Sequence, residues 1–369
     1  MRLNVPLTGQ EEAAAVAEVL ASGFLTQGPR AAELERLVAR RVGAASAFAT
    51  SSATTGLHLA LHALGVGPGD EVVIPDFSFP ATANVVVQQG AVPVFVDIDP
   101  ATFNLDPSLL EAAITERTRA IMPVHAFGLA ADMDAITAIA ASRGLPVVED
   151  AACALGAEYH GREAGSLGTA GVFSFHPRKI ITTGEGGMVT TSDAALAERI
   201  AVLRSHGAVR GSHFMSFVDA GYNYRLSDVH AAIGLAQWGR LEHILERRRA
   251  LAAAYDGILA DVDGVVTPTQ PEGLRHTYQS YVIMLDTDID RDRVIDEMRA
   301  RDVETTLGTY SMHLQPYFRE RFGIADEELP AATRAHRSAL TLPLYPQLEQ
   351  AELELVAEAL RASIAAARA

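Results

Sequence analysis

One side chain in this sequence differs chemically from all the others. Lys179 is the only lysine among 369 residues, so 29 of the 30 Lys and Arg residues are arginine. A lysine amine can lose its proton and attack a carbonyl to form a Schiff base, which a guanidinium cannot do in practice. Enzymes hold pyridoxal phosphate (PLP) in this way. A compositional bias toward Arg and Ala would also leave one lysine by chance, so the count alone leaves both interpretations open.

The segments around Lys179 place it on a loop between two strands. GVFSF at 171–175 is a short β-branched and aromatic run that predicts a buried strand, and MVTT at 188–191 predicts another. The turn-forming residues TTGEGG lie between them. Loops carried by a rigid sheet are where catalytic groups tend to be found, which favours a functional lysine.

Composition and charge narrow the class of protein. The formal net charge of −16 disfavours a nucleic-acid-binding surface. A single cysteine, Cys153, cannot form an internal disulfide, which suits a reducing compartment. The first residues have no apolar core of signal length, and no run approaches the roughly 18 apolar residues of a membrane span. We therefore predict a cytoplasmic protein with no nucleic-acid or membrane partner.

Arg247, Arg248 and Arg249 form the densest basic cluster of the sequence. Because they lie on a predicted helix, we expect them to form a solvated helix face.

Strands and helices alternate along the first two thirds of the chain. Helices are predicted at 10–22 and 30–42 and in the apolar-periodic segments that follow the strands SAFAT, EVVIP and RAIMPVHAFG; further strands are predicted in VPVFVDID and LPVVEDAA. This alternation predicts βαβ units and a mostly parallel sheet, whose ligands bind at the carboxyl ends of the strands. Asp150 lies at such an end, and so do the loops after Ala49, Ile74 and Phe175.

A single long helix is predicted from about Arg225 to residue 259, followed by a smaller α/β region. We predict a large domain at 1–245 and a small C-terminal domain at 246–369. Within the large domain, SSATTGLHLALHAL places small hydroxyl residues just before an apolar helix. This arrangement is typical of a phosphate-binding helix amino terminus.

Seven motifs in order resemble the DegT/DnrJ/EryC1/StrS family of PLP-dependent sugar aminotransferases. They are GFLTQGP, TSSATTGLHLALHALGVGPGDEV, PDFSFPATAN, PVHAFG, VVEDAACALGA, FSFHPRKIITTGEGG and GYNYRLSDVHAAIGLAQ. The resemblance implies PLP fold type I, with a seven-stranded, mostly parallel sheet sandwiched by helices in the large domain. It also implies a homodimer with shared active sites. The activity it implies is transfer of an amino group from an amino acid, expected to be L-glutamate, to a nucleotide-linked keto sugar.

The resemblance also assigns roles to individual residues. Lys179 matches the Schiff-base lysine, and Asp150 matches the acid that pairs with the pyridine nitrogen, although an arbitrary aspartate at a strand end is more often a cap. Phe79 matches the aromatic residue that stacks on the ring, and Asn223 matches a residue that reaches the neighbouring subunit's phosphate. The remaining implied cofactor contacts are Ala53, Thr54, Cys153, Ser174 and His176. The implied substrate contacts are Thr26, Glu185, Arg225 and His313.

Two positions depart from the family pattern, and one pair of residues offers a different chemistry. Cys153 stands where relatives usually carry His or Gln beside the ring, and Ala53 replaces a common Gly. His58 and His62 have the i, i+4 spacing of zinc ligands on a predicted helix. No Glu follows His58 and no third ligand is apparent, so we predict no metal site.

Lys179 favours transamination, because dehydrating relatives carry histidine at that position. The TTGEGG loop resembles relatives that act at carbon 4 of the hexose, so a 4-keto-6-deoxyhexose is the expected acceptor. Two alternatives stay open. The acceptor could be a keto-cyclitol, which would use the same catalytic set. The protein could also be a sugar-nucleotide sensor without turnover, which would have no need for both Lys179 and Asp150.

Overall fold

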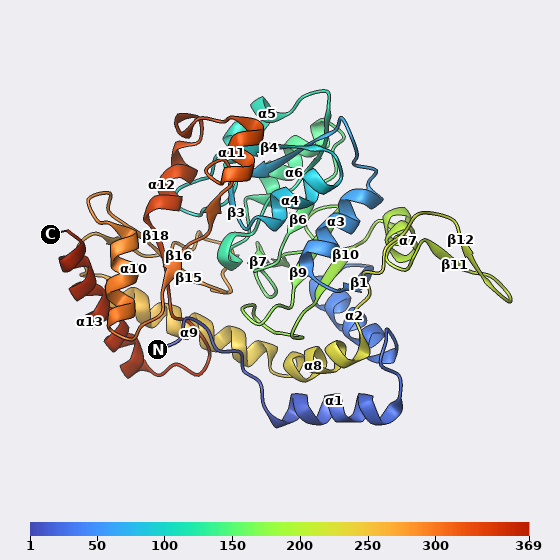
Figure 1. Ribbon diagram of the computed structural model, residues 1–369, viewed down its shortest axis with the longest axis horizontal. Helices are drawn as coiled ribbons and strands as arrows, with labels where there is room; N and C mark the ends of the chain where they lie inside the picture. Colours follow the sequence, from blue (N-terminus) through green and yellow to red (C-terminus); the bar gives the residue numbers. More distant parts are fainter. Residues whose placement is uncertain (369) are drawn as a thin grey trace.

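The computed structural model describes residues 1–368 and shows an α/β protein whose helices lie against the faces of its sheets (Figure 1). The predicted alternation of helices and strands in the first two thirds of the chain is confirmed. These elements are α1 (Gln10–Ser22), α2 (Pro29–Val42), β1 (Ser46–Thr50), α3 (Ala53–Ala63), β2 (Glu71–Pro75), α4 (Ala81–Gln88), β4 (Val92–Val96), β5 (Thr118–Ile121), α6 (Met133–Ser142), β6 (Val148–Asp150), β9 (Ala170–Ser174), β10 (Gly187–Thr191) and α7 (Ala194–Leu203).

The strands of this region fall into two sheets. One has four strands in the order β1-β10-β9-β6, with β6 and β9 parallel and the other neighbours antiparallel; the other has three parallel strands in the order β4-β2-β5. Isolated parallel bridges join Ile121 to Val147 and Val124 to Asp150. The α/β class is therefore confirmed, whereas the structure divides the expected continuous seven-stranded sheet into four and three strands. The carboxyl ends of β5, β6 and β9 share one edge.

The helix α3 is buried between the sheet and neighbouring helices. Leu57, Leu59 and Leu61 are each at most 1% exposed, and the helix contacts β9, β10, α4 and α7. A helix that is apolar on nearly every face is stable only inside a core. Its amino terminus is consequently fixed against the end of the sheet.

The long helix predicted from Arg225 is in fact two helices. α8 (Asp228–Trp238) ends at Gly239, and α9 (Leu241–Leu259) begins after Arg240, whose φ of −110° and ψ of 4° are not helical. The Arg240 guanidinium forms an ion pair with Glu12 of α1 and donates to the carbonyl of Leu7 at 3.2 Å. The predicted domain boundary at 245/246 falls inside α9 and stays a prediction.

The C-terminal region has its own antiparallel sheet and apolar core. The sheet order is β13-β15-β18-β16, and residues such as Leu251, Tyr255, Tyr281 and Leu353 form a buried cluster beside it. Its elements are β13 (Val265–Val266), β15 (Tyr281–Leu285), α10 (Arg291–Ala300), β16 (Thr306–Leu307), β18 (Ala339–Leu342) and α13 (Gln350–Ala367).

The prediction of a solvated arginine face on α9 is wrong. Arg248 is only 2% exposed, and its guanidinium donates to the carbonyls of Tyr278, Gln279 and Leu344, each at 3.1 Å. Burial lowers the pKa of Arg248 to about 10. Backbone carbonyls brought together from distant segments satisfy this charge, so the local sequence carries no sign of its burial.

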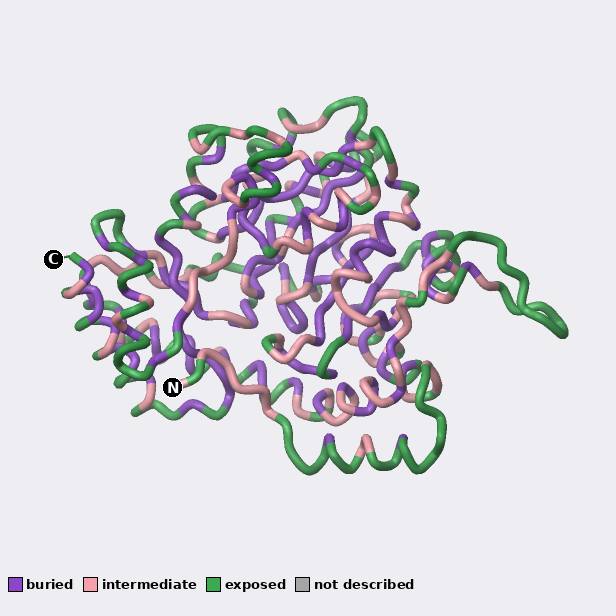
Figure 2. Tube along the Cα trace, in the orientation of Figure 1, coloured by how far each residue is buried: buried purple, intermediate pink, exposed green. Residues whose placement is uncertain are grey.

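Short elements complete the fold. A hairpin of β11 (Ala208–Arg210) and β12 (Met215–Phe217) projects from the body and is exposed along its length (Figures 1 and 2). Phe214, in the turn at its tip, is 85% exposed, and Phe217, which pairs with Ala208 at its base, is 70% exposed. The other short elements are β3 (Phe77–Ser78), α5 (Leu110–Ala113), β7 (Glu158–Tyr159), β8 (Arg162–Glu163), β14 (Leu274–Arg275), β17 (Tyr310–Ser311), α11 (Pro316–Phe322) and α12 (Pro330–Ser338). Among residues 1–368, no helix has the length and apolar character needed to cross a bilayer.

A fully buried carboxylate ties β6 to the turn that leads into β9. Glu149 accepts the backbone N–H groups of Gly165, Leu167 and Gly168, each at 2.7 Å, and the Nε2–H of His125 at 2.9 Å. The His125 tautomer follows from the N–H of Ala131, which donates to its Nδ1 at 3.1 Å. With this many donors, the buried charge of Glu149 is well satisfied.

We predict that Glu149→Gln destabilises the protein. The amide NH2 would face an N–H donor, so at least one buried donor would lose its acceptor, and the free energy of unfolding should fall by about 3 kcal/mol. Urea denaturation measures this change. Glu358→Gln, on the exposed side of α13, is the matched control and should stay within about 0.5 kcal/mol of wild type. Equal effects of the two substitutions would contradict the structural role of Glu149.

Candidate active site

Several of the expected site residues meet where β1, β9 and β10 lie side by side. Thr50 at the end of β1 pairs with Gly187 at the start of β10, and Gly187 pairs with Ser174 at the end of β9. Asp150, the last residue of β6, pairs with Val172 of β9. The sheet register therefore brings Ser174 and Asp150 to the same edge, as expected for a ligand site in an α/β fold.

Asp150 is a buried carboxylate without an ion-pair partner among the described residues. It is 5% exposed, and it accepts hydrogen bonds from the Thr82 hydroxyl at 2.8 Å and the Ala152 N–H at 3.2 Å. Burial raises the pKa of Asp150, and the two hydrogen bonds and the nearby charge of Lys179 only partly oppose that rise. This position would favour a cationic N–H placed beside the carboxylate.

Lys179 lies in the turn between β9 and β10, facing the turn that follows Asp150. Its Nζ donates to the Sγ of Cys153 at 3.0 Å, and its backbone N–H donates to the carbonyl of His176 at 2.8 Å. The only lysine and the only cysteine of the sequence are therefore in direct contact. Cys153, the partner of this half-buried amine, follows the buried Asp150 by three residues. The amine is therefore well placed for carbonyl chemistry beside the acid.

The amino terminus of α3 has free backbone N–H groups of the kind that suit an anion. Ser52 caps the helix by accepting the N–H of Thr55 at 3.1 Å, which leaves the N–H groups of Ala53 and Thr54 directed outward. Gly187 allows the close approach of β10, because a Cβ on this residue would lie 2.6 Å from the Ala53 nitrogen. Ser174 is thus brought next to the free N–H groups of α3.

Phe79 and the residues beside it connect to Asp150. The Phe79 ring is 65% exposed. The preceding residue, Ser78, hydrogen-bonds through its hydroxyl to Thr82 at 2.8 Å, and Thr82 in turn donates to Asp150. Sequence reasoning missed Ser78 and Thr82, although two hydroxyl residues four positions apart at a helix entry were a usable signal.

His176 and Glu185 flank the lysine turn. The Nδ1 of His176 accepts the Arg178 N–H at 3.2 Å, and burial lowers the pKa of His176 while the charge of Glu185 opposes this shift. Glu185 itself is exposed. Both side chains therefore lie near Lys179, and Glu185 is open to solvent.

Arg225 and Asn223 lie in a segment beside the end of β1, and Thr26 is bonded to the start of α8. Arg225 forms a bridge with Thr50 and donates to the Ser205 hydroxyl at 3.0 Å. Asn223 is exposed, and its side chain has no hydrogen-bond partner within residues 1–368. Thr26 is also exposed, and its carbonyl accepts the N–H of Asp228 at 3.0 Å. Among the described residues, the Asn223 side chain makes no hydrogen bond to the α3 turn of its own chain, although the neighbouring Tyr224 carbonyl accepts the Ser51 N–H at 2.9 Å.

The expected substrate residue His313 is placed in the protein interior instead. It is 1% exposed; its Nδ1 donates to Asp76 at 2.7 Å and its Nε2 lies 3.2 Å from the Thr333 hydroxyl. Both ring nitrogens are engaged by the chain, so this arrangement leaves neither for a sugar. His313 stabilises the segment before β3.

His58 and His62 lie in an aromatic cluster. The His58 ring meets Tyr222 edge-on with centroids 5.1 Å apart, and the His62 Nδ1 lies 3.3 Å from both the Gln89 amide oxygen and the Tyr222 hydroxyl. Burial lowers the pKa of His58. Within the described part of the chain, no three His, Cys, Asp or Glu side chains are grouped as metal ligands.

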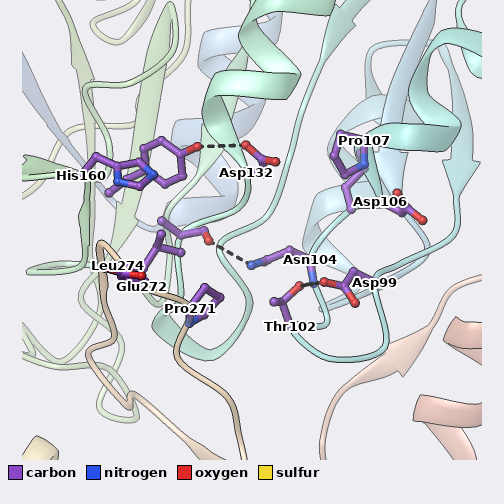
Figure 3. Close-up of a pocket in the computed structure, with 13 residues that line it drawn as sticks. Asp99, Thr102, Asn104, Asp106, Pro107, Asp132, His160, Pro271, Glu272 and Leu274 are labelled. Atoms are coloured by element: carbon purple, nitrogen blue, oxygen red, sulfur yellow. Dashed lines mark hydrogen bonds between the residues drawn. The ribbon is translucent and has the colours of Figure 1, made fainter.

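A separate pocket of about 390 Å³ lies away from Lys179 and Asp150 (Figure 3). Acidic and polar side chains line it; in one wall the Tyr159 hydroxyl donates to Asp132 at 2.9 Å, and in another the Asn104 amide donates to the carbonyl of Ala130 at 3.2 Å. None of the residues matched to the site motifs contributes to this pocket. The convergence of residues, and not cavity size, therefore identifies the candidate site.

The residues present fit PLP on physical grounds. Asp150 lacks a cation, which a protonated pyridine nitrogen would supply. The free N–H groups of Ala53 and Thr54, with Ser174, would hold a phosphate. Lys179 offers the one side-chain amine, and the chemistry PLP supplies when bound is an electron sink for a carbon that loses a proton.

Comparison with known proteins agrees with this assignment. The model of the DegT/DnrJ/EryC1/StrS aminotransferase family matches residues 6–361. The chain is 40% identical over 371 residues to the spore coat polysaccharide biosynthesis protein SpsC of Bacillus subtilis, covering 97% of this chain and 95% of that protein. It is 41% identical over 349 residues to a pleiotropic regulatory protein of Geobacillus stearothermophilus, covering 92% and 91%.

A solved structure shares the whole fold. Spr1654 from Streptococcus pneumoniae superposes with a TM-score of 0.95 at 28% identity, covering 100% of this chain and 98% of that one. Its solved structures include a PLP form and a form with pyridoxamine phosphate (PMP). The α/β arrangement described above is therefore the arrangement of PLP aminotransferase structures.

We predict that Asp150→Asn stabilises the PLP-free protein at pH 7. The asparagine Oδ1 can accept the Ala152 N–H, and its NH2 can donate to the Thr82 hydroxyl, so both hydrogen bonds are kept without a buried charge. Because the folded-state pKa of Asp150 is raised, its ionisation costs stability as the pH rises above the ordinary value of 3.8. The melting temperature of the variant should exceed that of wild type at pH 7, and the gap should close toward pH 4. A more stable wild type at pH 7 would contradict an uncompensated charge.

Proposed function

The chain belongs to the DegT/DnrJ/EryC1/StrS aminotransferase family, and from this membership we propose that it binds PLP at Lys179 and transfers an amino group from L-glutamate to a nucleotide-linked keto sugar. The observation that carries the proposal is the meeting of three features at one sheet edge. These are the lone amine of Lys179, the buried uncompensated carboxylate of Asp150 and the free N–H groups at the start of α3.

The residues divide the work of amino transfer. Lys179 forms the covalent bond to PLP and, as a free amine, moves the proton at the donor carbon. Asp150 keeps the pyridine nitrogen protonated. Ala53, Thr54, Ser174 and His176 hold the phosphate end, and Phe79 stacks on the ring. Cys153 contacts Lys179 and takes the place that His or Gln fills in relatives.

The sugar side of the proposal rests on resemblance and position. Arg225 is the candidate for binding the donor carboxylate in a bidentate pair. Thr26 and Glu185 are exposed beside the site and are available to the acceptor. The TTGEGG loop supports a 4-keto-6-deoxyhexose as acceptor.

We further propose that the active enzyme is a homodimer in which Asn223 completes the phosphate site of the second copy. Asn223 is exposed and without a side-chain hydrogen-bond partner among the described residues, and residues 218–222 connect it to the projecting hairpin with its exposed Phe214 and Phe217. An apolar arm of this kind is expected to be covered. A symmetric dimer would cover two arms at once and complete two sites.

A regulatory sensor is the second candidate, because one relative is named a pleiotropic regulatory protein. A sensor has to bind a sugar nucleotide and needs no turnover. This chain has both Lys179 and Asp150 at the candidate site. A sensor would not need both residues, so their presence favours the enzyme.

Borohydride reduction in the presence of PLP tests the proposal directly. Lys179 is the only lysine, so an intact mass and a peptide map should show one pyridoxyl group on Lys179. Lys179→Arg keeps the charge but should give no side-chain adduct and lower glutamate-dependent turnover by about 1,000-fold or more. A nucleotide-linked 4-keto-6-deoxyhexose and a keto-cyclitol, offered separately, distinguish the two acceptor classes. An adduct without turnover on either would favour the sensor.

Mixing two inactive variants tests the shared site. In a heterodimer of Lys179→Ala and Asn223→Ala chains, one site would carry both substitutions and the other neither, so random mixing should restore about one quarter of wild-type activity. Each variant alone supplies the background. Mixing that restores nothing would mean that Asn223 acts within its own chain.

A further inference from the structure

The turn at His276–Gln279 contacts both sides of the Lys179–Cys153 pair. The Thr277 hydroxyl donates to the carbonyl of Cys153 at 3.1 Å, and the Gln279 amide donates to the carbonyl of Arg178 at 2.7 Å. Arg178 directly precedes Lys179. A single short turn is therefore hydrogen-bonded to the backbone of Cys153 and to that of Arg178, the residue before Lys179.

This turn is strained and rigidly held. Tyr278 has a positive φ of 49°, which is unfavourable for a residue with a side chain. The buried guanidinium of Arg248 binds the carbonyls of Tyr278 and Gln279, and the Tyr278 N–H donates to the Nδ1 of His276 at 2.8 Å. The Tyr278 ring is stacked on His276 with centroids 4.1 Å apart. Strain of this kind persists where the surroundings fix it, and such positions cluster at active sites.

The turn also packs closely against the backbone of Phe127 and Gly128. The backbone N–H groups of Thr277 and Gln279 donate to the carbonyls of Gly128 and Phe127, both at 3.0 Å. Gly128 has a φ of 100°, and a Cβ there would lie 1.9 Å from the Thr277 hydroxyl oxygen. Only glycine permits this approach.

Asn4 provides a second contact with the lysine turn. Its Nδ2 donates to the carbonyl of Pro177 at 3.1 Å, while its Oδ1 accepts from Arg248 at 3.1 Å. Asn4 belongs to an N-terminal segment that runs along the C-terminal region, where the Leu344 N–H donates to the carbonyl of Leu3 at 3.2 Å. Arg248 thus holds both Asn4 and the 276–279 turn.

We propose that Asn4, Thr277 and Gln279, held by Arg248, are positioning residues that fix the Lys179 amine against Cys153. The carbonyls of Pro177 and Arg178, in the turn that carries Lys179, accept hydrogen bonds from Asn4 and Gln279, which are far away in sequence. The placement of Lys179 for PLP capture therefore depends on docking of the N-terminal segment and of the 276–279 turn. This inference rests on the proposed function of Lys179.

Hydrogen–deuterium exchange of the PLP-free protein tests whether these contacts hold the turn. Gln279→Glu and Asn4→Asp keep side-chain size and remove the donor to the lysine turn. Gln347→Glu is the matched control, because Gln347 donates an amide to the carbonyl of Pro6, in the same N-terminal segment and away from Lys179. We expect exchange in a peptide spanning 176–183 to be about fivefold faster in the first two variants. The control and the rest of the chain should exchange as wild type does.

PLP capture distinguishes a positioning role from a purely structural one, because a purely structural role would leave the affinity of Lys179 for PLP unchanged. The PLP concentration that half-saturates borohydride-trapped labelling of Lys179 should rise about fivefold in Gln279→Glu and in Asn4→Asp, and stay unchanged in Gln347→Glu. Faster exchange without a change in capture would overturn the positioning role, and so would exchange no different from that of the control. Wild-type protein that captures no PLP at Lys179 would refute the proposed function instead, while the exchange data would still decide whether the turn is held.

Discussion

The burial of Asp150 at the end of β6 is the constraint on which the site depends. Its carboxylate has two neutral donors and no ion-pair partner among the described residues. The backbone prevents it from reaching water, because the Asp150 N–H donates to the carbonyl of Pro123 at 2.9 Å and its carbonyl accepts from His125 at 3.0 Å. A fold that keeps an unfavourable charge in place without neutralising it preserves the place for a cation.

The adjacent residue shows that this arrangement is specific to Asp150. Glu149 is also fully buried, yet it accepts four hydrogen bonds and is at the centre of a satisfied network with His125. Adjacent residues of a strand point to opposite faces of the sheet, so Glu149 and Asp150 have different neighbours. Glu149 has four hydrogen-bond donors and Asp150 has two. Glu149 is satisfied within the fold, whereas Asp150 is left without a cation. Strand alternation thus gives two adjacent carboxylates opposite surroundings.

Local patterns predicted much of the fold. Alternating strands and helices gave the α/β class, and small hydroxyl residues before an apolar helix predicted the start of α3, which Ser52 caps and where we propose that a phosphate binds. Features that depend on distant contacts were not predictable in this way. The break between α8 and α9 follows the contact of Arg240 with α1, and the burial of Arg248 follows three carbonyls brought from two other segments, the 278–279 turn and Leu344. His313, matched to the substrate side by its motif, is instead bonded to Asp76.

The same distinction separates the two ends of the candidate site. The phosphate end is built from neighbours, since Ser52 and Thr55 form the turn and strand register adds Ser174. The amine end is built from distant parts of the chain, because Asn4 and Gln279 hold the carbonyls that precede Lys179. A local turn forms wherever its sequence folds, but the amine is correctly placed only when the N-terminal segment and the C-terminal region have both docked. The contact of Lys179 with Cys153 therefore depends on the completed fold, whereas the start of α3 depends on neighbours in sequence.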